Sequence, residues 1–391
     1  MKCTALLRRA STAFSLVELV VSMAVLLVIM LLLTQATDSM LKLWRDSDER
    51  ISSFQGARAA FERIGTSLEQ ATLQPYFDYV NASGDTRSQH AATASGTPFR
   101  PVRYARMSEL HFLAGHSANL IPEGSRTLTP GHTVLFQAPL GNTEITSYRK
   151  LDHLLNSAGF YVEFGDDSPN WPDFIQNLAS DAQGHAYRLV EWTQPAELLD
   201  VYNQTARPDY SRDWFSDTFL APPSTAASNL QTAPRVIAEH VPLLVFLPKL
   251  ARGEEAKLEG VAYQENLAGT YLCPNYEYDS RAWQQGYPGN ISGNLGGIPR
   301  TQLMRNQLPP LIDVVMIVVD SRDARRLQTG TTPPAELAVP ASLFQNAQQN
   351  AENLFEQDLD TYVQQLIDAS INFRMFRTTV TLKGAKWSNE S

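Results

Sequence analysis

The stretch that decides the architecture is FSLVELVVSMAVLLVIMLLL, residues 14–33. It is apolar throughout except for two serines and Glu18. A helix of this length covers roughly 30 Å, the thickness of a hydrocarbon core. An acidic residue costs about 2.5–3.5 kcal/mol at the centre of a span and less near its end, where Glu18 lies. The stretch therefore predicts a transmembrane helix over 14–33 whose single carboxylate needs a partner.

The segment before the span carries basic residues only. Lys2, Arg8 and Arg9 lie in residues 1–13, which contain no acid, so the positive-inside rule predicts a cytoplasmic N-terminus. The leader and span together are compatible with a plain membrane anchor. They are also compatible with an ordinary secretory signal, since residues 34–36 loosely match a small-x-small cleavage site. The apolar run exceeds the roughly 7–15 residues of a signal peptide's apolar region, which disfavours secretion.

A short basic leader, a small residue and then Phe-Ser-Leu-Val-Glu-Leu resembles the prepilin signal of type IV pilins and type II secretion pseudopilins. This resemblance implies that a prepilin peptidase cuts between Ala13 and Phe14 and methylates the new amine of Phe14. It also implies that Glu18 neutralises the Phe14 amine of a neighbouring subunit during assembly. The family usually carries Gly where this chain has Ala13.

The resemblance implies that the chain is a minor pilin or pseudopilin subunit. It also implies a single-pass protein of the inner membrane, with its head in the periplasm. Its expected partners are the peptidase, other pilins or pseudopilins and the inner-membrane assembly platform. The alternative is a membrane-tethered binding or adhesion module that has a prepilin-like anchor and does not polymerise. Nucleic acid is not an expected partner, because the net charge is −9, and −12 once the three leader cations are removed.

Beyond the span, apolar residues continue at helical spacing up to the first proline, Pro75. The pattern predicts a leader over 1–13, a transmembrane helix over 14–33, an amphipathic continuation over 34–74 and a globular head over 75–391. A sheet is expected to cover the apolar stripe, and an independent coiled coil is the alternative. The stripe comprises Met40, Leu43, Trp44, Ser47, Ile51, Phe54, Ala57, Phe61, Ile64, Leu68 and Ala71.

The head is predicted to be α+β, with a mainly antiparallel, pilin-like sheet packed on the long helix. Helical spacing predicts one further helix over 341–369. Partial alternation of β-branched and aromatic residues predicts strands at 101–107, 109–114, 133–138, 159–164, 187–192, 243–247, 312–319 and 371–382.

Two later segments extend the resemblance. The order of residues 187–192 and 309–314 is similar to that of larger minor pseudopilins of the J type and minor pilins of the W type. The tail from Ile371 to Ser388 resembles the C-terminus of the "Verru_Chthon cassette protein C" family, which also has a prepilin-type N-terminus.

Motifs for catalysis are absent from the sequence, which contains no Gly-x-Ser-x-Gly, His-Glu-x-x-His or phosphate-binding glycine loop. A non-enzymatic protein without a cofactor is therefore predicted. His111 and His116 are five residues apart, which suits neither strand nor helix register for joint ligation. Cys273 is the only cysteine outside the leader and is expected to be a packed thiol, with an intermolecular disulfide as the alternative.

One acidic loop is a weak candidate for a metal site. Asp166, Asp167 and Asp173 lie in a stretch rich in Ser, Pro and Asn, and carboxylates are calcium ligands. Their spacing does not match an EF-hand, so a solvated turn is the alternative interpretation.

Overall fold

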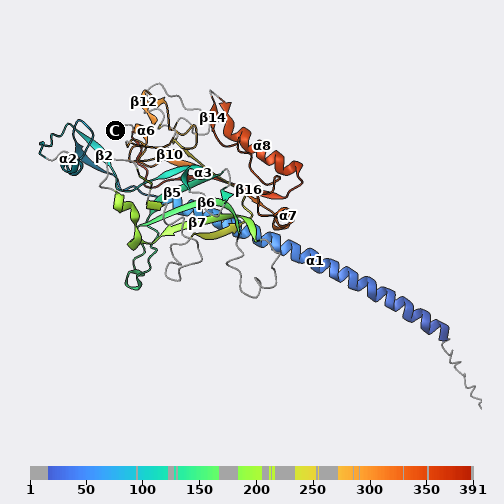
Figure 1. Cartoon of the computed structure of the whole chain (residues 1–391). Helices are drawn as coiled ribbons and strands as arrows, with labels where there is room; N and C mark the ends of the chain where they lie inside the picture. Colours follow the sequence, from blue (N-terminus) through green and yellow to red (C-terminus); the bar gives the residue numbers. More distant parts are fainter. Residues whose placement is uncertain are drawn as a thin grey trace, which may run out of the picture. The chain divides into compact units, whose positions relative to one another are not determined.

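A computed structural model describes residues 16–93, 96–121, 127–128, 131–166, 184–204, 211–212, 214–215, 234–251, 254, 272–284, 286–289, 291–328, 330–349 and 352–388. The chain divides into two compact units, Met1–Ser52 and Ser53–Ser391. Helix α1 (Leu16–Glu69) supplies the described part of the first unit, and its last turns belong to the second (Figure 1). The protein is α+β with antiparallel sheets and a long N-terminal apolar helix, as predicted.

The larger sheet has seven strands, with the order β10-β3-β5-β6-β7-β8 and with β4 also paired to β6. Every pairing in it is antiparallel. Its strands are β3 (Leu113–His116), β4 (Thr127–Leu128), β5 (His132–Ala138), β6 (Asn156–Asp166), β7 (His185–Gln194), β8 (Arg235–Glu239) and β10 (Tyr278–Asp279).

The smaller sheet has the order β16 (Phe373–Thr381), β13 (Leu311–Val319) and β9 (Leu243–Lys249), again antiparallel. Strand β13 is central and almost completely buried, which explains its continuous apolar sequence. Its one charge, Asp313, accepts hydrogen bonds from Lys249 Nζ at 2.5 Å and Thr379 Oγ1 at 2.6 Å. A buried carboxylate is tolerated because both neighbouring strands satisfy it.

The remaining elements are short, apart from α8. A separate ribbon pairs β1 with β2, and two further hairpins pair β11 with β12 and β14 with β15. These elements are β1 (Tyr76–Val80), α2 (Arg87–Thr93), β2 (Arg103–Met107), α3 (Ser117–Leu120), η1 (Thr146–Tyr148), η3 (Ala196–Leu198), η4 (Asp200–Gln204), β11 (Asn294–Leu295), β12 (Ile298–Pro299), α6 (Arg300–Leu303), α7 (Ser321–Leu327), β14 (Gln348–Gln349), β15 (Glu352–Asn353) and α8 (Leu354–Asp368).

Each predicted strand segment overlaps a strand, but two helix boundaries were wrong. Helix α1 ends at Glu69 rather than at residue 74, because the Thr72 N–H donates to the Gln137 carbonyl of β5 at 2.9 Å. The helix predicted over 341–369 is only α8. The Asn353 side chain accepts from the Glu356 N–H and fixes the start of α8, as N-cap residues do.

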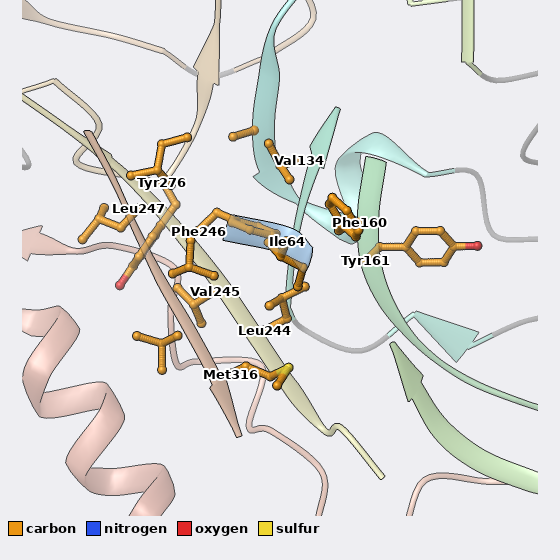
Figure 2. Packing of buried hydrophobic residues seen from close by; sticks show 14 of the residues in the cluster. Ile64, Val134, Phe160, Tyr161, Leu244, Val245, Phe246, Leu247, Tyr276 and Met316 are labelled. Atoms are coloured by element: carbon orange, nitrogen blue, oxygen red, sulfur yellow. The ribbon is translucent and has the colours of Figure 1, made fainter. Parts of the chain in front are cut away.

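The second part of α1 lies in the core of the head. Ala57, Phe61, Ile64 and Leu68 are buried at helical spacing, and the Phe61 and Phe376 rings lie 5.7 Å apart. Figure 2 shows Ile64 among side chains of both sheets, with Phe160 of β6 on one side and Phe246 of β9 on the other. Burying each such side chain contributes about 1.5–3 kcal/mol.

The predicted apolar stripe is therefore covered only in part. Met40, Leu43, Trp44 and Ile51 were expected against a sheet, yet they are 56–76% exposed. These residues lie in the Met1–Ser52 unit, and the core of the head takes up the stripe only from residue 54 onwards.

Candidate functional site in the N-terminal helix

Residues Leu16–Arg45 of α1 are long and apolar enough to cross a membrane. The large apolar side chains from Leu16 to Leu33 are each at least 50% exposed, and they lie on every side of the helix. A helix that is apolar all round needs lipid or other helices around it, because water solvates it poorly. The segment is therefore compatible with a membrane span.

The hydroxyl groups of this segment are satisfied within the helix. Ser22 Oγ donates to the Leu19 carbonyl at 2.9 Å, and Thr34 Oγ1 donates to the Met30 carbonyl at 2.8 Å. Such bonds to the preceding turn remove the cost of placing a hydroxyl in hydrocarbon. Glu18, in the first turn of α1, is the only ionisable residue from Leu16 to Thr37. Within the described part of the chain, no hydrogen bond or ion pair reaches its carboxylate.

The other residues predicted for this site lie outside the described residues, because Ala13 and Phe14 belong to residues 1–15. The same holds for Asp167 and Asp173 of the calcium candidate. Asp166 is the exposed last residue of β6 and pairs in register with His185 of β7. Among the residues that the structure describes, no three His, Cys, Asp or Glu side chains are placed to hold a metal ion.

Two ion pairs attach the end of α1 to the head. Arg63 Nε donates to Glu191 Oε1 on β7 at 2.7 Å, and Lys383 Nζ lies 2.9 Å from the Glu69 carboxylate. Glu191 is only 3% exposed and also accepts from Arg235 at 3.3 Å. Sequence reasoning missed these residues, since the partner of Arg63 is distant in the chain and no local spacing marks it.

The contact between a buried histidine and a buried aspartate was not predicted from the sequence either. His111 Nε2 lies 2.8 Å from Asp279 Oδ1, and Trp214 Nε1 lies 3.0 Å from His111 Nδ1. Because an indole N–H can only donate, Nδ1 must accept and Nε2 carries the proton. Burial lowers the pKa of His111 and outweighs the nearby Asp279 carboxylate, so the ring is neutral. All three side chains are fully buried, so this pair cannot act on an external substrate.

Cys273 is a free, fully buried thiol, as its solitary position predicts. Burial raises its pKa well above the usual range, so the sulfur remains protonated. A protonated thiol is neither a nucleophile nor a metal ligand, so its role is packing.

Comparisons of the chain with models of protein families, with curated proteins and with solved structures gave no match. The candidate site is therefore defined by its own chemistry. It consists of one carboxylate at the start of an apolar helix whose large apolar side chains are exposed. Such an arrangement can insert into a membrane, pack against similar helices and bind one cation there.

Proposed function

We propose that the protein is a minor pilin or pseudopilin, a subunit of a type IV pilus or of a type II secretion-like filament. Residues 14–33 anchor it in the inner membrane, with the N-terminus in the cytoplasm and the head in the periplasm. The observation that carries the proposal is Glu18, a lone carboxylate at the start of a helix segment that is apolar on every side.

The energetics of Glu18 favour assembly over a passive anchor. An unpaired carboxylate in an apolar surrounding is costly, and an opposite charge nearby removes much of that cost. The amine of Phe14 in a neighbouring subunit is the proposed partner, and pairing with it sets the axial register. Packing among the apolar helices of neighbouring subunits supplies the assembly energy.

The same proposal implies how the chain is processed and which partners it meets. A prepilin peptidase removes residues 1–13 and methylates the amine of Phe14, after which other pilins or pseudopilins and the assembly platform receive the subunit. The pilin-like head, from residue 53 onwards, is large and would crowd a major helical array, so the subunit is minor and belongs near a filament tip. The proposal assigns it no enzymatic activity and no cofactor.

Replacement of Glu18 tests the assembly step. The Glu18→Leu protein, expressed with its cognate assembly machinery, should enter the membrane and be cleaved, because the segment becomes more apolar. It should be absent from sheared filaments, since the neighbour's amine would lose its partner. Val20→Leu is the matched control and should assemble normally. Glu18→Leu protein in filaments at wild-type levels would refute the pairing.

Mass spectrometry of the mature N-terminus tests processing. The expected chain begins at Phe14 and carries one methyl group on its amine. A chain that begins at Thr37 would mean ordinary secretion, and one that retains Met1 would mean a plain anchor.

A second candidate is a membrane-tethered binding or adhesion module that does not polymerise. It is favoured by the division of the chain at residue 52, because the head has its own core and needs residues 16–45 only as an attachment. A tether should tolerate Glu18→Leu in localisation and in head function, whereas a filament subunit should not.

A further inference from the structure

A cavity of about 580 Å³ lies in the head, where the β1–β2 ribbon approaches residues 283–305. Arg103, Arg305, Trp283 and Asp85 line it. Arg103 begins β2 and Arg305 follows α6, so the tertiary fold brings together residues from distant parts of the chain. The pilin proposal uses none of these residues.

Arg305 is buried without a counter-charge. Arg305 is only 2% exposed. Within the described residues its guanidinium forms no ion pair and no hydrogen bond to oxygen. Its Nη2 lies 3.9 Å from Met107 Sδ, which is a weak acceptor, and its Nε has no hydrogen-bond partner among the described residues. The guanidinium also lies over the Trp283 ring, with Cζ 4.0 Å from the ring centroid.

The surroundings of the Arg305 guanidinium are energetically unfavourable. A buried charge without a counter-charge destabilises a fold, and neighbouring like charges add to the cost. Burial, with Arg103 and Arg106 nearby, lowers the pKa of Arg305 to about 10, so the side chain remains charged near neutral pH. The indole N–H of Trp283 is a second buried donor that has no acceptor among the described residues.

We propose that this cavity binds the oxyanion group of a ligand, a carboxylate, sulfate or phosphate. Arg305 and Arg103 supply the positive charge, and the Trp283 ring supports the Arg305 guanidinium from one face. A guanidinium presents its donors in a fixed fork that matches such oxygens. Among the lining residues that the structure describes, Asp85 is the only acidic one, and its carboxylate accepts from the Asn81 side-chain amide at 3.1 Å. Two arginines against one aspartate leave this described part of the lining positive.

Equilibrium dialysis of the full-length protein in mild detergent tests the proposal. Radiolabelled sulfate, phosphate and acetate are offered separately, with sodium chloride keeping the ionic strength constant. At least one of the three should bind saturably with one equivalent per chain, and their ranking identifies the class of oxyanion. No saturable binding of any of the three up to millimolar concentrations would overturn the proposal.

Variants assign the binding to this cavity. Arg305→Met keeps an apolar stem on Trp283 and should weaken binding at least tenfold, as should Arg103→Met at the exposed start of β2. Arg149→Met, at an exposed arginine outside the cavity lining, should leave binding unchanged. In buffer without the bound anion, Arg305→Met should melt no lower than the wild type, because it removes an uncompensated buried charge. Unchanged anion binding in Arg305→Met would overturn the assignment.

Discussion

The two parts of helix α1 share a backbone conformation but present different surfaces. In residues 16–45 the apolar side chains point in every direction and none of the segment is buried. In residues 53–69 one stripe is buried, and the other faces carry charges such as Arg58 and Glu62. Helical propensity alone therefore does not distinguish a helix that packs in the head from one that needs an external apolar environment. The width of the apolar surface separates them.

Truncation of one isoleucine in each part should give the largest contrast. Ile64→Ala should lower the free energy of unfolding of the head by about 2–5 kcal/mol, because Ile64 is fully buried between the sheets. Ile29→Ala, at a residue that is 51% exposed, should leave that free energy unchanged. Urea denaturation of the full-length protein in mild detergent, followed by near-ultraviolet circular dichroism, measures both. Equal losses would mean that residues 16–45 also pack in the head.

The second largest effect is expected from acid, which should destabilise the head but not the helix of residues 16–45. Burial lowers the pKa of His111, His132 and His240, so the unfolded chain, with histidine pKa near 6.5, takes up protons first. Head stability should be complete above about pH 6.5 and should fall as the pH decreases towards the folded-state pKa values. Residues 16–45 contain no histidine, so their helical signal in detergent should persist.

A single variant sharpens the acid prediction. His132→Phe keeps an aromatic ring beside Tyr276, 4.5 Å away, and removes one titrating group. It should reduce the slope of unfolding free energy against pH by up to one proton, or about 1.4 kcal/mol per pH unit. Thermal or urea denaturation between pH 7 and pH 5 measures the slope. A slope equal to that of the wild type would show that His132 does not contribute.

The ion pair that attaches α1 to the large sheet should have a smaller effect. Arg63→Ala should cost about 1 kcal/mol, since Glu191 is buried but keeps its contact with Arg235. Arg58→Ala is the matched control, because both side chains of the Arg58–Glu62 pair are exposed. Its loss should hardly change the free energy of unfolding. Urea denaturation distinguishes the two, and equal effects would place Arg63 among ordinary surface residues.

The smallest expected effect is an increase in the stability of the head. Gly56→Ala should stabilise the head by about 0.5–1 kcal/mol, because a Cβ there meets no atom within 4 Å and alanine favours the helix. Gly384→Ala should destabilise instead, since its Cβ would lie 2.7 Å from the Ala71 carbonyl oxygen. Thermal denaturation measures both signs. A loss of stability in Gly56→Ala would show that the absence of a side chain at this position matters.

Local patterns predicted most of the regular structure of the head, with identifiable failures. The strands β6 and β13 were predicted because segments 159–164 and 312–319 are rich in β-branched or aromatic residues. Strand β1 was missed although it is rich in aromatic residues, because only its pairing with β2 makes so short a segment a strand. The helix predicted over 341–369 failed in its first half, where the β14–β15 hairpin forms instead.

For the candidate site, the apolar segment, the lone carboxylate of Glu18 and the basic leader could be predicted from the sequence, because composition and position along one helix define them. The fold was needed to show that the apolar stripe is covered from residue 54 onwards, that Arg63 contacts Glu191 and that Arg305 and Arg103 line one cavity. These relations depend on strand register and on packing between residues far apart in the chain. Local spacing contains no information about such partners.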